Sequence, residues 1–126
     1  MKRPREPVEF RRGDVLWIGC DPSVGAEPRK VRSCVVVSND IANQFGAVVT
    51  VVPTQPHTSE RARRAYMVDL RPPRSSLQHP RVANASMIMS YDRSRVVSKA
   101  GRVHAEAMAA LDRALSVHLA LPSADG

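Results

Sequence analysis

The chain has 126 residues, a length that favours one domain with one modest core. Its formal net charge of +7 indicates a polyanion as partner, most simply a nucleic acid, although solubility or an acidic protein partner would also explain it. Cys20 and Cys34 lack zinc-site spacing, and neither a secretion signal nor a membrane-spanning run is visible, so we expect a cytoplasmic protein without a membrane segment.

The first part of the chain predicts an arm, a strand and a loop. Residues 1–12 are rich in proline and arginine, so we interpret them as a flexible basic arm. Residues 14–20 predict a strand whose two alternating sets of side chains are both largely apolar, as in a barrel strand packed on both sides. Residues 21–28 contain two prolines and a glycine and predict a loop.

The second predicted strand, residues 31–38, contains the β-branched run Val35-Val36-Val37 and begins next to a group of cations. Arg32 therefore lies at the mouth of a rigid strand, where a guanidinium is well placed to act on a phosphate. Residues 39–46 predict a polar turn or a short helical turn. Residues 47–53 predict a third strand, which we expect to end at Pro53 because proline cannot donate to a central ladder.

Two further strands and a helix are predicted after this point. Residues 54–64 and 71–81 are expected to be exposed loops on either side of a strand at 65–70, and a further extended region follows at 82–91. Residues 104–121 show an apolar stripe at helical spacing, and Pro122 is expected to stop the helix before a short tail, residues 122–126. The stripe consists of Met108, Leu111, Leu115, His118 and Leu119.

Several short motifs occur in a specific order. Residues 12–17 read RGDVLW, residues 21–27 read DPSVGAE, Arg32 precedes an apolar strand that ends in SND at residues 38–40, and residues 91–97 read YDRSRVV. In this order and at this spacing they resemble the MazF/PemK toxins of bacterial toxin–antitoxin systems. The resemblance is dense over residues 12–53 and looser over residues 67–121.

The resemblance implies a mainly β, α+β fold: an SH3-like small β-barrel of the CcdB/PemK type, residues 13–97, with the C-terminal helix, in a single domain over residues 1–126. It further implies a homodimer and a cognate antitoxin protein as partner. The implied activity is a metal-independent, sequence-selective endoribonuclease on single-stranded mRNA that leaves a 2′,3′-cyclic phosphate and a 5′-hydroxyl. Neither a metal nor a small-molecule cofactor is expected.

The resemblance places an arginine and a threonine next to the scissile phosphate, and these correspond to Arg32 and Thr54. A guanidinium supplies forked donors to phosphate oxygens, although a surface salt bridge to Glu27 would also account for Arg32. The family pattern is proline, one residue, then threonine, whereas Thr54 directly follows Pro53. A bulge must therefore compensate, Gln55 must occupy the position, or the hydroxyl is displaced; a turn-forming threonine is the alternative.

A second set of residues is expected to contact RNA. It comprises Glu27, Arg29, Gln55, His57, Arg61, Arg63, Arg64 and Met87. A salt bridge is an equal alternative for Glu27, and an exposed loop position is the alternative for His57. Met87 stands where the family often has a glutamine, and Ser33 stands where it has a proline after the arginine. Both departures imply an altered RNA preference or a weaker activity.

Two other functions remain open from the sequence. A CcdB-like toxin that binds gyrase would share the barrel and would not need the Arg32 and Thr54 pair, but the last four residues lack the tryptophan-containing end of that branch. A catalytically weak RNA-binding relative would be consistent with Ser33 and Met87.

Overall fold

A computed structural model of the chain describes residues 7–19 and 30–122, and our expectations for Cys20, Glu27, Arg29 and the outer parts of both tails lie outside these ranges. The strands are β1 (Asp14–Gly19), β2 (Val31–Val36), β3 (Val48–Pro56), β4 (Met67–Asp69), β5 (Arg81–Asn84), β6 (Met89–Asp92) and β7 (Val96–Arg102). The helices are α1 (Asp40–Phe45), α2 (Ser59–Ala62) and α3 (Ala105–His118), with 3-10 turns η1 (Ala85–Met87) and η2 (Arg93–Arg95). None of the described helices combines the length and apolar character needed to cross a bilayer.

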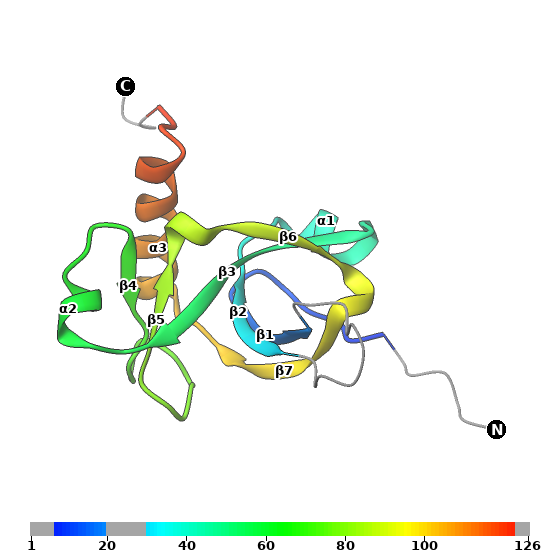
Figure 1. Cartoon of the computed structure of the whole chain (residues 1–126). Coiled ribbons are helices and arrows are strands. Elements are labelled where there is room, and N and C mark those ends of the chain that lie inside the picture. The colour runs from blue at the N-terminus through cyan, green and yellow to red at the C-terminus, as the bar shows by residue number, and fades with distance from the viewer. Residues whose placement is uncertain (1–6, 20–29, 123–126) are drawn as a thin grey trace.

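The strands form one antiparallel sheet in the order β4-β5-β3-β2-β1-β7, and β6 also pairs with β3. Figure 1 shows β1, β2, β3, β6 and β7 curled into a ring, with β4, β5 and α2 to one side of it. Helix α3 packs against β4 and η1 beside the ring. The expected mainly β, barrel-like fold with a C-terminal helix is therefore confirmed.

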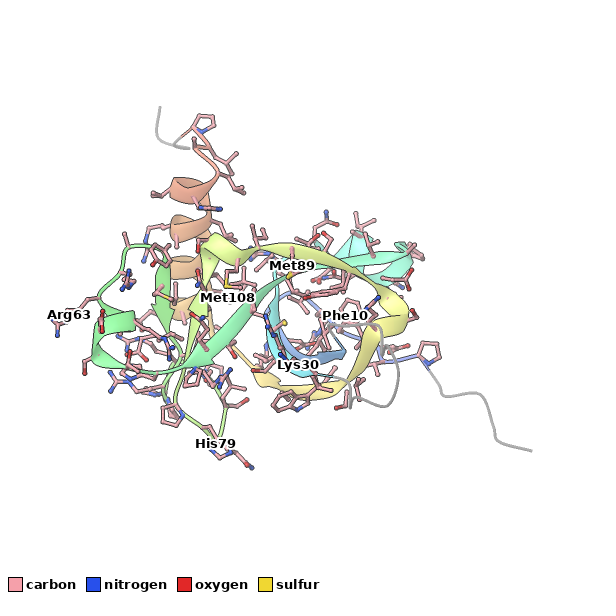
Figure 2. All side chains as sticks on the ribbon, viewed as in Figure 1. Phe10, Lys30, Arg63, His79, Met89 and Met108 are labelled. Carbon is pink, nitrogen blue, oxygen red and sulfur yellow. The ribbon has the colours of Figure 1, made fainter. Side chains whose placement is uncertain are left out.

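The central strands bury side chains on both of their faces. Leu16, Cys34 and Val51 belong to an apolar cluster that also contains Phe10, which lies inside the ring in Figure 2. Their neighbours Val15 and Val35 belong to a second cluster, which packs under α3. Alternation along each strand thus sends successive residues to two different cores. A face-by-face alternation of polar and apolar residues is absent from the sequence for this reason.

The expected end of the third strand at Pro53 is wrong, because β3 continues to Pro56. Pro53 pairs with Cys34 of β2, while the other edge of β3 leaves β6 after Val51 and joins β5 at Thr54. Proline costs least at such a change of partner, where the ladder is already interrupted. Residues 54–64 are consequently the end of a strand followed by α2, rather than one exposed loop.

Several other boundaries differ from the expectation. The arm does not extend to residue 12, because Phe10 is buried and Arg93 lies 4.6 Å from the centre of its ring. The strand region continues through β7 to Arg102 instead of ending at residue 97, and the second loop ends where β5 begins at Arg81. Residues 85–87 form η1 rather than extended chain. Helix α3 ends at His118, which is exposed rather than packed.

The start of β1 is fixed by a tight turn and a buried carboxylate. Gly13 has φ +94°, a conformation that favours glycine, and its N–H donates to the Val36 carbonyl at 2.9 Å. Asp14 is only 5% exposed, accepts from the Arg11 N–H at 2.8 Å and from Arg102 at 2.8 Å, and lies 3.5 Å from Lys99 Nζ. Burial raises the pKa of Asp14, but these donors outweigh it, so the pKa lies below its usual value.

We expect Asp14→Asn to destabilise the protein at pH 7 by about 1–3 kcal/mol, because hydrogen bonds to a buried carboxylate are lost. A carboxylate with a lowered folded-state pKa stabilises the fold above its unfolded pKa, and this contribution disappears as the pH falls through the folded value. The wild type should therefore lose stability below about pH 4 more steeply than Asp14→Asn. Urea unfolding at a fixed protein concentration across pH measures this.

The exposed Asp112, which pairs with Arg12, provides the control. Asp112→Asn should change the free energy of unfolding at pH 7 by less than about 1 kcal/mol. Equal acid slopes for the wild type and Asp14→Asn would contradict the assignment of this contribution to Asp14.

Candidate active site

A cavity of about 480 Å³ opens where β1, β2 and β7 meet the segment that leads into β5. Its polar and aromatic lining consists of Trp17, Arg32, Ser33, Gln78, His79, Arg81 and Lys99. No carboxylate occurs among the described residues that line it. An aromatic surface surrounded by cations suits a single-stranded nucleic acid, because bases stack on rings and phosphates bind cations.

A larger cavity, of about 760 Å³, lies between the N-terminal segment and α1, and its lining is electrostatically mixed. Glu9 and Asp40 line it together with Arg11 and Arg93. Carboxylates repel a phosphate at short range, so the smaller, purely cationic cavity is the better candidate for an anionic substrate.

Arg32 is an exposed cation of the smaller cavity. It lies at the start of β2, where the backbone pairs with Ile18 of β1. Within the described part of the chain its side chain makes no hydrogen bond or ion pair. The strand therefore fixes the backbone of Arg32, and no described residue pairs with its guanidinium; Glu27, the alternative partner, lies outside the described residues.

Thr54 is joined to the cavity through Ser33. The β2–β3 register pairs Cys34 with Pro53, and one step further brings Ser33 opposite Thr54. Their hydroxyl oxygens are 2.5 Å apart, and both residues are buried. Thr54 itself does not line the cavity. The Thr54 hydroxyl is thus displaced from the cavity behind that of Ser33, one of the arrangements left open by the sequence.

Arg81 of β5 completes this hydrogen-bonded group. Its Nε donates to Thr54 Oγ1 at 2.9 Å, and its Nη2 donates to the Thr54 carbonyl at 2.9 Å. Burial lowers the pKa of Arg81 from its usual value, the nearby charge of Arg61 lowers it further, and the smaller effect of Cys34 opposes them. A partly buried cation therefore lies directly behind the hydroxyl pair.

The other described residues that were expected to contact RNA lie outside the lining of this cavity, and Glu27 and Arg29 fall outside the described ranges. Gln55 accepts from Asn84 at 3.2 Å, and Met87 lies in η1 with 37% of its surface exposed. The His57 side chain is 11% exposed, not fully exposed, and its Nε2 is buried 3.7 Å from Asp69 without a hydrogen-bond partner among the described residues.

The three arginines in and directly after α2, namely Arg61, Arg63 and Arg64, are held by local contacts. Arg61 donates to the Pro56 carbonyl at 2.9 Å and Arg63 donates to the Ser59 carbonyl at 3.4 Å. Arg64 pairs with Glu60 at 3.3 Å. Figure 2 shows Arg63 at the outer end of this region, well away from Lys30 at the start of β2. Of the three, only Arg61 has an electrostatic effect on Arg81.

Sequence reasoning did not assign site roles to Trp17, Ser33, Arg81 and Lys99. Trp17 reads as a core residue in an apolar strand, yet it is 40% exposed and pairs with Ser33 across β1 and β2. Arg81 reads as the end of a loop. The only available signal was the serine after Arg32, at a position where a proline was expected.

Comparison with known proteins agrees with this architecture. The sequence profile of the family described as "PemK-like, MazF-like toxin of type II toxin-antitoxin system" matches residues 11–119. Endoribonuclease MazF9 of Mycobacterium tuberculosis is 38% identical over 118 residues, covering 89% of this chain and 98% of the relative. Endoribonuclease EndoA of Bacillus subtilis is 31% identical over 113 residues, covering 88% and 95%. The chain belongs to the PemK-like, MazF-like toxin family.

Solved structures share the fold. A MazE–MazF crystal structure from Deinococcus radiodurans superposes with a TM-score of 0.75 at 20% identity, covering 91% of this chain and 99% of that one. An endoribonuclease from a mycobacterial species, solved in complex with its cognate antitoxin, superposes with a TM-score of 0.72 at 22% identity. The match covers 90% of this chain and 98% of that one.

We expect Thr54→Val to cost about 1–3 kcal/mol of folding free energy, because it leaves the Arg81 Nε donor and the Ser33 hydroxyl without their partner. Both side chains are β-branched, so the preference for extended structure is preserved. Urea unfolding measures the difference.

Thr50→Val is the matched control on the same strand. Thr50 Oγ1 lies 2.7 Å from Ser90 Oγ in an exposed pair, so water replaces the lost partner. A cost for Thr54→Val no greater than that for Thr50→Val would show that the buried contacts contribute little.

Proposed function

We propose that this chain is the toxin of a type II toxin–antitoxin pair and acts as a sequence-selective endoribonuclease on single-stranded RNA, independently of a metal ion. The observation that carries the proposal is the Arg32 guanidinium, which pairs with no described residue and shares a cavity with Arg81 and Lys99 but with no described carboxylate. The names of the two relatives, both endoribonucleases, support it. The family match favours this function over gyrase binding.

The proposed reaction is an internal transfer at phosphorus. The 2′-oxygen forms a bond to phosphorus and loses its proton to a base, while the bond from phosphorus to the 5′-oxygen breaks and that oxygen gains a proton. The products are a 2′,3′-cyclic phosphate and a 5′-hydroxyl. Negative charge accumulates on the non-bridging oxygens in the transition state, and the forked donors of Arg32 stabilise it. Fixed cations thus perform the electrostatic part of the reaction.

We propose that Trp17 and Lys99 hold the RNA strand on either side of the reacting phosphate. Trp17 is the aromatic side chain of the cavity and is exposed enough for a base to stack on it. Lys99 is half exposed and lies near Asp14, so it supplies a phosphate contact with a partly neutralised charge.

The proposed protein partner is a cognate antitoxin with an acidic segment. Two structural neighbours support a protein partner: the mycobacterial endoribonuclease was solved in complex with its cognate antitoxin, and the Deinococcus radiodurans structure contains MazE with MazF. A surface with net charge +7 attracts an acidic peptide as well as RNA, so the two ligands are expected to compete.

The function is tested by incubating the protein with a defined RNA in EDTA and mapping the new ends. Arg32→Ala should lower the single-turnover rate by roughly a thousandfold or more, because a charged donor to the transition state is lost. Arg32→Lys should recover little, since an ammonium lacks the fork.

Arg113→Ala, on the exposed side of α3, controls for general loss of charge. Thermal melts should show folded proteins throughout. Full cleavage by folded Arg32→Ala would remove this residue from the mechanism, and absence of cleavage by the wild type would exclude the proposed activity.

We also propose a homodimer that buries the apolar surface of α1 and the start of β3. Ile41, Phe45 and Val48 are 75%, 77% and 51% exposed there, an unusual cluster for a monomer surface. Phe45→Asp should convert a dimer into a monomer without unfolding it, because Phe45 contributes little to the core. Light scattering at micromolar concentration measures the mass. A wild-type mass near the 13.8 kDa of one chain would contradict the dimer.

A further inference from the structure

Ser33, Thr54 and Arg81 form a continuous chain of hydrogen bonds that ends at the cavity. Arg81 Nε donates to Thr54 Oγ1 at 2.9 Å, and the hydroxyl oxygens of Thr54 and Ser33 are 2.5 Å apart. Ser33 lines the cavity, and Thr54 does not. Arg81, which also lines the cavity, is therefore linked to Ser33 through Thr54, in the order guanidinium, Thr54, Ser33.

Donor accounting sets the direction of these hydrogen bonds. A guanidinium only donates, so Thr54 Oγ1 must accept from Arg81. If Ser33 also donated to Thr54, the Thr54 proton would need another acceptor, and the described residues offer its hydroxyl no other contact. If Thr54 donates to Ser33 instead, the Thr54 proton has its acceptor, and the one proton of the pair without a partner among the described residues is that of Ser33. The second arrangement leaves one hydroxyl proton facing the cavity, from Ser33.

We propose that Ser33, rather than Thr54, is the hydroxyl that donates to a non-bridging oxygen of the scissile phosphate, and that Thr54 and Arg81 are positioning residues that orient it. This inference rests on the proposed endoribonuclease function. Ser33 follows Arg32 directly in β2, so a charged donor and a neutral donor reach the same cavity from one rigid strand. The Arg81 cation at the other end of the hydrogen-bonded chain polarises the two hydroxyls in series, which strengthens Ser33 as a donor.

The position of Ser33 between two neighbouring strands explains why it is the donor and Thr54 the positioning residue. Trp17 pairs with Ser33 on one side of β2, and Thr54 contacts it on the other. Ser33 is thus held between two neighbouring strands, with its backbone and its oxygen both fixed. A donor that needs no reorganisation when charge develops on phosphate is the most effective kind.

The test is a double-mutant cycle on single-turnover RNA cleavage in EDTA, with Ser33→Ala, Thr54→Val and the double variant. Ser33→Ala should lower the rate on the order of a hundredfold, as expected when one oxyanion donor is lost. Thr54→Val should lower it about tenfold, because Ser33 keeps its proton and loses only its orientation. In the Ser33→Ala background Thr54→Val should have little further effect, because both act through one hydroxyl.

Two conservative variants separate a chemical role from a structural one. Thr54→Ser keeps the hydroxyl and should restore most of the rate. Ser33→Cys keeps a weak donor of similar shape and should fall between the wild type and Ser33→Ala. Affinity for a non-cleavable 2′-O-methyl RNA, measured by fluorescence anisotropy, should change much less than the rate in every variant.

Thr50→Val is the matched control, since its exposed hydroxyl pair with Ser90 lies on β3 outside the lining of the cavity, and its rate should equal that of the wild type. Full activity of Ser33→Ala, or a large loss from Thr54→Val in the Ser33→Ala background, would overturn the inference while leaving the endoribonuclease function intact. A wild type that does not cleave RNA would overturn both.

Discussion

Strand β3 exchanges one hydrogen-bonding neighbour for another between Val51 and Thr54, and the arrangement of the cavity depends on this exchange. Up to Val51, β3 pairs with β6 as part of the ring. From Thr54 on, it pairs with β5 beside α3. β2 remains alongside through the paired residues Cys34 and Pro53. Three strands therefore converge at Thr54, and Arg81 can reach its hydroxyl and its carbonyl only because β5 joins there.

This convergence places polar groups where apolar ones would otherwise pack. Burying hydroxyls without partners costs free energy, and so does burying a guanidinium. Here each supplies what the other needs: the guanidinium donates to Thr54, and the Thr54 hydroxyl lies within hydrogen-bond distance of that of Ser33, which lines the cavity. The group also ties β2 to β5, which share no ladder. The same hydrogen bonds thus fix the position of Ser33 at the cavity and give the buried polar groups their partners.

The valine-rich strands and the helical stripe predicted the ring and α3 well, because both signals depend on local periodicity. Phe10 was misread, because nothing in the basic sequence around it shows that its ring enters the barrel. Pro53 was read as a strand end, since sequence alone does not reveal a change of partner on one edge. At the site, Arg32 was recognisable as a cation at a strand mouth. The contact of Ser33 with Thr54 and Arg81 depends on register and on a third strand, which no local pattern encodes.

The ion pairs of the described residues leave some of the protein's positive charge unpaired at the cavity. On the described surface, Asp69 neutralises Arg71 and Arg74, Asp112 neutralises Arg12, and Asp14 is shared by Arg102 and Lys99. No carboxylate pairs with Arg32 or Arg81 in the described part of the chain. Two cations that line the cavity, Arg32 and Arg81, therefore keep their charge with respect to the described residues, and low-dielectric walls strengthen their field there. A phosphate that approaches is attracted first by this field. It is then bound by Arg81, which two hydrogen bonds already hold in place, and by Arg32, whose backbone is fixed in β2, so only the Arg32 side chain has to be ordered.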